Sequence, residues 1–288
     1  MIRTMTLVGA GNVGRTLARL LSDSGVEITG VTSRSAASTE RAAAALNAPA
    51  IDGLDTLPPS DLVLVTTPDD LIGDTARRLA ASGRLADGTI LLHCSGATPS
   101  SVLRHDSATP YRVASVHPVK TFTDPERDAA SFAGTYCGVE GDSDALDALV
   151  PLFERIGAVC FTIREEHKLL YHTASVFASA YLFGIIKTAY DLYEVAGVDR
   201  AVAAKILDPI MHATVTNALT HGPEKTVTGP VSRGDVGVVE RQIAALEATF
   251  PDRAALYKLL GREAVDLAQA KGVASDDSLD RLRTLLTL

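Results

Sequence analysis

The sequence predicts an α/β fold in which a doubly wound parallel sheet is followed by an all-helical domain. Three observations lead to this prediction. Short apolar runs alternate with amphipathic stretches up to residue 163, a glycine-rich turn joins the first such pair, and no strand pattern follows residue 163. Strands that alternate with helices form parallel sheets with helices on both faces. We therefore expect a first domain at 1–163 and a second domain at 164–288.

The elements of the first domain follow from this alternation. Residues 62–65 read Leu-Val-Leu-Val, an unbroken apolar run that is typical of a parallel strand buried on both faces. In chain order we expect strand 5–9, helix 13–21, strand 27–32, helix 39–46, strand 62–65, helix 71–81, strand 90–93, strands 113–116 and 135–139, helix 144–156 and strand 159–163.

The second domain is expected to contain helices only. Residues 165–196 read as one helix, about 48 Å long at 1.5 Å per residue, which Gly197 ends as a C-cap glycine. Within it, residues 169–186 lack Lys, Arg, Asp and Glu, and this length is near the lower limit for a membrane span. Because the run is rich in Ser, Thr, Tyr and His, we prefer a helix buried in a domain or dimer. Further helices are expected at 199–219, 236–249, 252–271 and 278–286.

Composition and charge limit the partners of the protein. Of the 288 residues, 46% are hydrophobic and 22% are charged, which is typical of a soluble globular protein. A net charge of −8 argues against a general nucleic-acid-binding or anionic-membrane surface. The three cysteines, Cys94, Cys137 and Cys160, have neither the spacing of a metal site nor the even count of a disulfide framework. We expect a cytoplasmic protein without signal peptide or metal, which binds neither nucleic acid nor membranes.

The strongest local motif is Gly-x-Gly-x-x-Gly, which stands between the first predicted strand and the first predicted helix. Its residues are Gly9, Ala10, Gly11, Asn12, Val13 and Gly14. In such a motif the first glycine permits a tight turn, the second lets the backbone approach a pyrophosphate, and the third allows close packing of helix on strand. The helix N-terminus then offers free N–H groups to the phosphates. The motif in this context predicts a dinucleotide cofactor.

The end of the second predicted strand indicates which dinucleotide. It reads Ser33-Arg34-Ser35, where a protein that binds NAD would place a carboxylate for the ribose 2′-hydroxyl. Ser33 and Ser35 can donate hydrogen bonds, and Arg34 can stack on adenine and pair with a 2′-phosphate. The alternative for Arg34 is a solvated surface arginine. We predict NADP as the cofactor.

Two further loops leave predicted strands at the carboxyl edge of the sheet, where such folds bind ligands. Thr66, Thr67 and Pro68 follow the third strand and are expected to flank the cofactor. Ser95 and Gly96 follow the fourth strand and are candidates for the nicotinamide end. Ordinary turn capping is the alternative for Thr66 and Ser95.

Several motifs occur in a fixed order along the chain: the glycine loop, TTPDD, HCSGA, SVHPVKTF, a Lys-x-x-Tyr-His-Thr-Ala helix start and TGPVSRGD. Together they resemble Rossmann-like proteins with a C-terminal helical domain of unknown function, within the 6-phosphogluconate dehydrogenase-like superfamily. Relatives include ketopantoate reductase and pyrroline-5-carboxylate reductase. Two positions depart from the family pattern, because Ala180 stands where an Asn is expected and Gln242 where a His is expected.

The resemblance implies a function as well as a fold. It implies an NADP-dependent oxidoreductase that reduces a small carbonyl acid, as ketopantoate reductase does. An imine reductase of the pyrroline-5-carboxylate type and a non-catalytic NADP-binding sensor or scaffold are the alternatives. It also implies an active site between the domains and a homodimer formed through the C-terminal helical domain.

Lys168 and His172 are the candidate catalytic residues. They are four positions apart on a predicted helix and therefore share one face. Reduction of a carbonyl needs a proton donor. The resemblance implies Lys168 for this role, with His172 as the second choice, and Ser175 near the same stripe is expected to contact substrate. The alternatives are a solvated lysine in the first turn and a core histidine.

Arg233 is the candidate for holding a substrate carboxylate. It lies in the loop TGPVSRGD, and its guanidinium could receive a carboxylate with two parallel hydrogen bonds. The alternative is a surface pair with Asp235, which would contribute less than about 1 kcal/mol. Asn217, as a substrate contact, and His117 are weaker candidates, for which a core or turn role is the alternative.

Overall fold

The computed structural model describes residues 1–105 and 111–288. Its contacts divide the chain into two compact units, Met1–Ala180, here called the sheet unit, and Tyr181–Leu288, here called the helical unit. This division lies later than residue 163, where the predicted pattern changes from strands to helices. The reason is that the first turns of the following helix pack onto the sheet through Lys168 and Tyr171.

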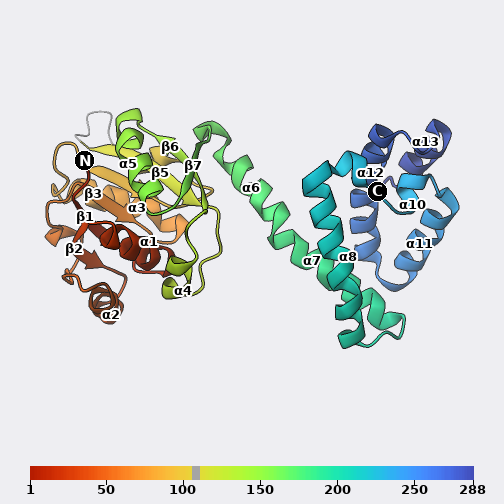
Figure 1. The fold of residues 1–288 in the computed structure, drawn as a ribbon, viewed down its shortest axis with the longest axis horizontal. Helices are drawn as coiled ribbons and strands as arrows, with labels where there is room; N and C mark the ends of the chain where they lie inside the picture. Colours follow the sequence, from red (N-terminus) through yellow and green to blue (C-terminus); the bar gives the residue numbers. More distant parts are fainter. Residues whose placement is uncertain (106–110) are drawn as a thin grey trace. The chain divides into compact units, whose positions relative to one another are not determined.

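The sheet unit contains a seven-stranded sheet in the order β2-β1-β3-β4-β5-β6-β7 (Figure 1). All neighbouring strands are parallel except β5 and β6. The strands are β1 (Thr4–Val8), β2 (Glu27–Thr32), β3 (Leu62–Val65), β4 (Ile90–His93), β5 (Arg112–Pro118), β6 (Tyr136–Gly141) and β7 (Val159–Thr162). This confirms the predicted α/β class with a mostly parallel, doubly wound sheet. The strand order reverses between β1 and β3, which is where such sheets bind ligands.

Helices cover both faces of this sheet. They are α1 (Asn12–Asp23), α2 (Ala36–Leu46), α3 (Asp69–Ala81), α4 (Pro125–Ala130) and α5 (Ser143–Arg155), with short 3₁₀ turns at Leu54–Thr56, Ser100–Leu103 and Glu165–His167. Strand β3 shows why its sequence is apolar throughout. Leu62 and Leu64 pack into one core together with α1 and α5, and Val63 and Val65 pack into a second core with α3 on the opposite face.

The helix expected over 165–196 is divided in the structure. After the 3₁₀ turn, α6 (Lys168–Ala178) and α7 (Ala180–Val195) follow each other with a break at Ser179. The Ser179 hydroxyl donates a hydrogen bond of 2.6 Å to the Ser175 carbonyl, and such bonds to residue i−4 bend helices. By length and composition the stretch Glu165–Val195 could cross a membrane, with mean hydropathy 1.5 and none of its most apolar window buried among the described residues. A single stretch of this kind is weak evidence for a membrane span.

The helical unit also contains α8 (Arg200–His221), α9 (Pro223–Thr226), α10 (Pro230–Arg233), α11 (Val236–Thr249), α12 (Pro251–Lys271) and α13 (Asp276–Leu285). The short helices α4, α9 and α10 were not predicted from the sequence. The core of this unit is formed by α10 to α13, with Val239, Val265 and Leu282 fully buried. None of the residues of α7, all of which the structure describes, is buried.

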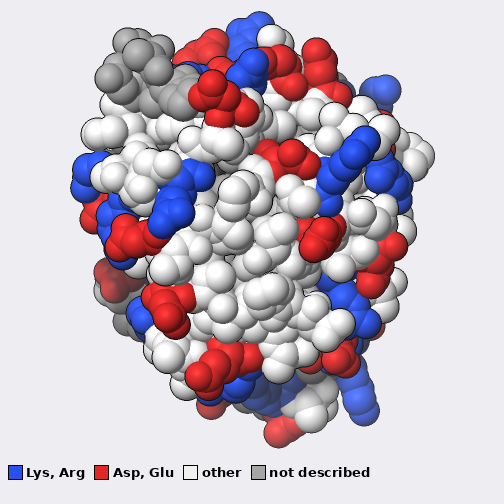
Figure 2. Space-filling model, turned by 90° about the vertical axis from the view of Figure 1, so that its left-hand side faces the viewer, with Lys and Arg blue, Asp and Glu red and all other residues white. Residues whose placement is uncertain are grey.

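Charged side chains of both signs are interspersed on the face of the sheet unit that Figure 2 presents. They surround a broad centre without charged residues. This face therefore has no continuous basic stripe.

Candidate cofactor and substrate site

The glycine turn between β1 and α1 has three positions with different surroundings. Gly9 has a φ of +96°, and a Cβ there would lie 2.7 Å from the Thr66 carbonyl carbon. A Cβ at Gly14 would lie 2.5 Å from the Gly9 carbonyl oxygen and would overlap the Thr66 hydroxyl. At Gly11, in contrast, no described atom lies within 4 Å of the Cβ position. The first and third glycines thus permit close backbone packing, and the second leaves an open surface.

The N-terminus of α1 is open to an anion. Its N-cap is Gly11, and among the described residues no side chain caps it and no acidic residue lies in its first turn. The Asn12 side chain instead donates to the carbonyls of Phe122 and Thr123, at 3.3 and 3.1 Å, and holds the loop after β5. A hollow of about 700 Å³ beside α1 and α4 is lined partly by Asn12 and Arg15. Asn12 and Val13 can therefore contact a phosphate through main-chain N–H groups.

The loop after β3 places its two threonines differently. The Thr66 N–H donates to the Val8 carbonyl at 2.8 Å, and its hydroxyl donates to the Gly9 carbonyl, so Thr66 holds the glycine turn in place. The Thr67 hydroxyl oxygen is buried and has no hydrogen-bond partner among the described residues. Pro68 is the N-cap of α3. A buried hydroxyl without a partner is costly, so Thr67 is suited to bind a ligand beside Gly9.

The segment after β2 leaves its arginine free. Ser35 caps α2, because its hydroxyl accepts from the Ser38 N–H at 3.3 Å. The Ser33 N–H donates to the Thr39 hydroxyl at 2.9 Å. Arg34 is exposed and forms no ion pair with any residue that the structure describes. Its guanidinium is available for a phosphate group next to the N-terminus of α2.

The hydroxyl of Ser95 already has three partners. It donates to Asp69 Oδ2 at 2.7 Å and accepts from the N–H groups of Ala97 and Thr98 at 3.2 and 3.0 Å. The Ser95 N–H donates to His93 Nδ1 at 3.1 Å, so His93 is buried with a hydrogen bond, and burial lowers its pKa to about 3. The Ser95 side chain therefore stabilises its own loop. This arrangement corresponds to turn capping, the alternative role considered for Ser95.

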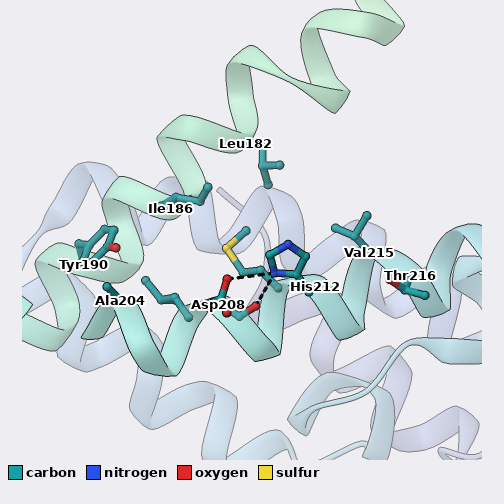
Figure 3. Close-up of a pocket in the computed structure, with 10 residues that line it drawn as sticks. Leu182, Ile186, Tyr190, Ala204, Asp208, His212, Val215 and Thr216 are labelled. Atoms are coloured by element: carbon teal, nitrogen blue, oxygen red, sulfur yellow. Dashed lines mark hydrogen bonds and ion pairs between the residues drawn. The ribbon is translucent and has the colours of Figure 1, made fainter. Parts of the chain in front are cut away.

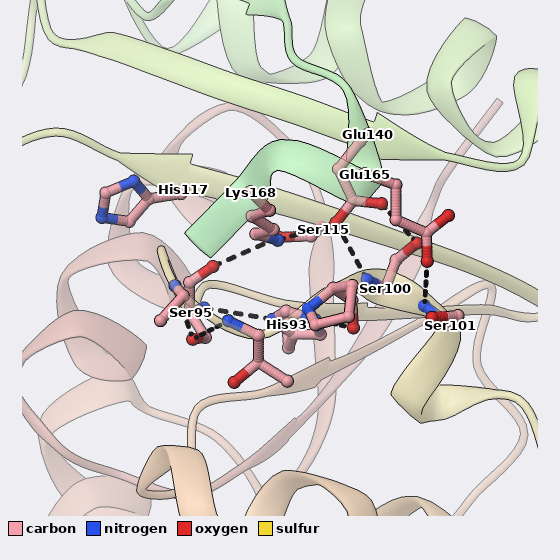
Figure 4. A network of polar contacts seen from close by, with 12 residues as sticks. His93, Ser95, Ser100, Ser101, Ser115, His117, Glu140, Glu165 and Lys168 are labelled. Atoms are coloured by element: carbon pink, nitrogen blue, oxygen red, sulfur yellow. Dashed lines mark hydrogen bonds and ion pairs between the residues drawn. The ribbon is translucent and has the colours of Figure 1, made fainter. Parts of the chain in front are cut away.

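Lys168 is almost completely buried, with 1% of its side chain exposed. Its Nζ lies 2.7 Å from Glu140 Oε1, and it also donates to the Ser115 hydroxyl (Figure 4). Glu140, which is 3% exposed, accepts two further hydrogen bonds from the N–H and hydroxyl of Ser100, at 2.9 and 2.6 Å. Burial lowers the pKa of Lys168, and the hydrogen bond and charge of Glu140 oppose this shift. The structure thus differs from the solvated-lysine alternative, and the ammonium joins α6 to β5 and β6.

Three aromatic side chains meet next to Gly96. The ring centroid of His117, at the end of β5, is 5.6 Å from that of Tyr171 and 6.0 Å from that of His172. His117 Nδ1 is 2.9 Å from the Tyr171 hydroxyl. A Cβ at Gly96 would lie 2.6 Å from His172 Cδ2 and 2.7 Å from His117 Nε2. His172, His117 and Gly96 therefore lie side by side.

The sequence did not predict the pairing of His117 with Tyr171. The available signal was that His117 ends a strand whose carboxyl end lies at the ligand-binding edge. Tyr171 of α6 packs against Gly138 of β6, and the antiparallel pairing that brings β6 next to β5 cannot be predicted from local sequence. Among the described residues no group of three or more His, Cys, Asp and Glu could hold a metal ion.

The predicted substrate contacts have few partners. Arg233 Nη2 lies 2.8 Å from Asp235 Oδ2, and its side chain is 61% exposed, as in the surface-pair alternative. Asn217 is exposed on α8, and Ser175 is half-buried on α6. Their role toward a substrate remains a prediction.

A groove of about 600 Å³ lies between α7 and α8 within the helical unit (Figure 3). Its lining is mainly apolar, with Leu182, Ile186 and Val215 among its residues. His212 Nδ1 lies 3.2 Å from Asp208 Oδ1 on the same wall. None of the predicted site residues is among the residues that line this groove.

The chain matches two family models in succession. Residues 3–118 match the Rossmann-like domain, and residues 135–264 match the domain of unknown function DUF2520. No match was found among curated proteins.

Solved structures share the fold over most of the chain. The protein TM1727 from Thermotoga maritima is 26% identical with a TM-score of 0.74, covering 93% of this chain and 99% of that chain. A Bacteroides fragilis protein, provisionally described as an NADP oxidoreductase, is 22% identical with a TM-score of 0.70 over 91% and 98%. Pyrroline carboxylate reductase from Plasmodium falciparum, with NADP bound, is 15% identical with a TM-score of 0.54 over 95% and 98%.

Proposed function

We propose that this chain is an NADP-dependent oxidoreductase that reduces a small carbonyl acid. Its sequence combines a Rossmann-like domain with the C-terminal domain DUF2520. The observation that carries the proposal is the geometry of the glycine turn. Gly9 and Gly14 permit close packing, Gly11 faces open space, and the N-terminus of α1 has no side-chain cap among the described residues. This combination fits a pyrophosphate.

The groups present fit the rest of an NADP molecule. The unpartnered Thr67 hydroxyl lies beside the glycine turn. Arg34 and Ser33 would hold the 2′-phosphate near the N-terminus of α2, where no carboxylate repels it. A bound reduced nicotinamide would supply a hydride. The contribution of the protein would be to bind the acid, with Arg233 as the proposed partner of its carboxylate, and to provide a proton.

Two alternatives retain specific support. This chain shares its fold with a pyrroline carboxylate reductase whose structure contains NADP. This similarity supports an imine acid as the alternative substrate. The burial of Lys168 against Glu140 favours a non-catalytic NADP-binding sensor or scaffold, because this ammonium is already engaged. Turnover separates these alternatives. A carbonyl acid or a cyclic imine acid would oxidise NADPH in the first two cases, and neither would do so in the third.

We further propose a cytoplasmic homodimer formed through the helical unit. Helix α7 has no buried residue in this fully described stretch, and its Phe183 is 74% exposed. Exposed apolar side chains continue along α8, with Ile210 and Leu219. Apolar surfaces of this extent mark interaction sites in soluble proteins. The apolar groove between α7 and α8 belongs to this surface.

The cofactor assignment is tested by titration of the purified protein with NADPH and NADH. We expect NADPH to bind more tightly. Arg34→Asp should weaken NADPH binding by about tenfold to a hundredfold, since it replaces a charge-assisted hydrogen bond worth about 1.5–3 kcal/mol by repulsion. NADH binding should be unchanged or improved. Arg281→Glu, an exposed position on α13, is the control. Equal loss of both cofactors in Arg34→Asp would contradict the assignment.

A further inference from the structure

His117 is held by one hydrogen bond at one ring nitrogen only. Its Nδ1 lies 2.9 Å from the Tyr171 hydroxyl, and its Nε2 has no hydrogen-bond partner among the residues that the structure describes. The position of Tyr171 depends on Gly138 of β6, where a Cβ would lie 2.7 Å from the phenol oxygen. Gly138 is the neighbour of His117 on the adjacent strand, and because it has no side chain the phenol of Tyr171 can lie over it and reach His117.

The environment sets which group carries the proton in this pair. Burial raises the pKa of Tyr171 to about 12, and burial lowers the pKa of His117 to about 4. His172 and Lys168 lower the pKa of His117 further, and Asp69 opposes them. At neutral pH the phenol is therefore protonated and the imidazole is neutral. We assign the phenol as the donor in the 2.9 Å contact with Nδ1, and this assignment places the single ring proton of His117 on Nε2.

The Nε2–H group lies at the ligand-binding edge of the sheet. A Cβ at Gly96 would be 2.7 Å from Nε2, so the ring stands directly over the backbone that follows β4. Strands β1, β3, β4 and β5 are parallel, and therefore their carboxyl ends, with the glycine turn and Gly96, share this edge. The ring of His117 therefore lies at the edge of the sheet where such folds bind ligands.

We propose that His117 is the catalytic proton donor to the substrate oxygen, and that Tyr171 is a positioning residue that fixes its tautomer. This inference rests on the proposed reductase function. When the carbonyl carbon accepts a hydride, the electron pair of the C=O π bond moves to oxygen. The Nε2–H bond breaks and an O–H bond forms. Nδ1 then takes the phenol proton of Tyr171, and a water molecule protonates the phenolate and leaves as hydroxide. The Nε2–H tautomer returns when Nε2 takes a proton from solvent water and Nδ1 gives its proton back to solvent.

The arrangement follows a known chemical pattern, in which a neutral histidine polarises a carbonyl because its surroundings keep it unprotonated. Lys168 fits a proton donor less well. Its ammonium is buried and donates to Glu140 and Ser115. In this assignment Lys168 anchors α6, and α6 in turn carries Tyr171 to His117.

The first test does not depend on turnover. Long-range ¹H–¹⁵N NMR of the full-length, ¹⁵N-histidine-labelled protein at pH 7 should show His117 neutral, protonated at Nε2 and unprotonated at Nδ1. In Tyr171→Phe the tautomers should become mixed, because the donor to Nδ1 is lost. A His117 protonated at Nδ1, or charged at pH 7, would overturn the proposal.

The second test uses NADPH oxidation with carbonyl acids. His117→Gln keeps an amide N–H but cannot transfer a proton, so kcat should fall by about 10²–10⁴-fold. NADPH affinity and the melting temperature should stay near those of the wild type. His221→Gln, at the exposed end of α8, should keep full activity. His172→Gln measures the competing assignment.

The outcomes separate the inference from the function on which it rests. If the wild type oxidises NADPH and His117→Gln keeps its kcat, only the assignment of His117 is wrong. A loss confined to His172→Gln would transfer the role to His172. If the wild type binds NADPH but turns over neither carbonyl nor imine acids, the proposed function fails, and the catalytic role of His117 fails with it.

Discussion

The sheet unit and the helical unit differ in how far each one covers its own apolar surface. In the sheet unit, β3 is buried on both faces, and even a lysine and a glutamate are buried as a pair. In the helical unit, α10 to α13 form a core, but the fully described α7 contributes no buried residue. A folded chain seldom leaves an apolar helix uncovered. The central strand of the sheet unit is thus covered within its own unit, whereas α7 leaves its apolar side chains exposed, which supports the proposed dimer.

The largest loss of stability is expected from a substitution in the buried pair Lys168–Glu140 of the sheet unit. Lys168→Met leaves the Glu140 carboxylate buried without its cation, which should lower the free energy of unfolding by about 3–5 kcal/mol. Chemical denaturation measures this loss. The double variant Lys168→Met/Glu140→Gln should recover part of it, because no unpaired charge remains.

Lys187→Met is the matched control for this prediction. Lys187 on α7 is exposed and pairs with Asp191, which keeps Arg253 as a second partner, so the loss of Lys187 should cost only about 0–1 kcal/mol. A loss for Lys168→Met as small as for Lys187→Met would contradict a buried ion pair between Lys168 and Glu140.

The glycine turn allows a sharper comparison within the sheet unit. Gly14→Ala places a Cβ against the Gly9 carbonyl and the Thr66 hydroxyl, and overpacking of this kind costs about 1–3 kcal/mol. Its melting temperature without cofactor should fall. Gly11→Ala meets no described atom within 4 Å, so its melting temperature should not change. Its NADPH affinity should still decrease, because the methyl group occupies the surface that the pyrophosphate approaches.

Calorimetry with and without NADPH measures both effects. A Gly11→Ala variant that binds NADPH as tightly as the wild type would contradict the proposed position of the pyrophosphate. Equal melting temperatures for Gly14→Ala and the wild type would contradict the close packing at the third glycine.

The proposed dimer contact of the helical unit can be tested at Phe183, an exposed apolar residue of α7. We expect the wild type to be a dimer, and Phe183→Glu to weaken it by about 30-fold or more, since truncating a central apolar contact costs about 2 kcal/mol or more. Sedimentation equilibrium measures the dissociation constant. Arg281→Glu on α13 is the control. A wild type that is monomeric at micromolar concentration would remove the basis of the dimer proposal.

The sequence predicted those features that depend on local pattern. The run at 62–65 is a strand because it is apolar on both faces, and the glycine motif forms the expected turn because only glycine fits positions 9 and 14. It could not predict that Lys168 lies inside the sheet unit. That position depends on Glu140, 28 residues away on a strand whose antiparallel pairing has no local signal.

The break at Ser179 escaped prediction for a related reason. Apolar periodicity continues across residues 165–196, and a serine within a helix gives no indication whether its hydroxyl binds the i−4 carbonyl. Similarly, Ser95 and Thr67 have the same residue chemistry in the sequence. Only the structure shows that one hydroxyl has three partners and that the other has none among the described residues.

The pair Tyr171–His117 gives the molecule an expected dependence of stability on pH. The pKa of His117 in the folded protein is lowered to about 4, and the ordinary value for histidine is 6.5. Between these values the unfolded chain binds more protons than the folded one, so stability should fall as the pH decreases from about 6.5 to 4. His93, with a pKa lowered to about 3, contributes in the same direction. Denaturation at a series of pH values measures this slope, and His117→Gln should reduce it.

Tyr171→Phe should raise the pKa of His117 by a small amount. The phenol donates to Nδ1 of the neutral ring, and a hydrogen bond to the neutral form opposes protonation. Without it the pKa of His117 should rise by about 0.5–1 unit, since such a bond contributes about 0.5–1.5 kcal/mol. NMR titration of the imidazole measures the shift, and the acid limb of kcat should move to higher pH by the same amount. A pKa that falls instead would mean that His117 donates from Nδ1 to the phenol oxygen, with Nε2 unprotonated and unable to supply a proton.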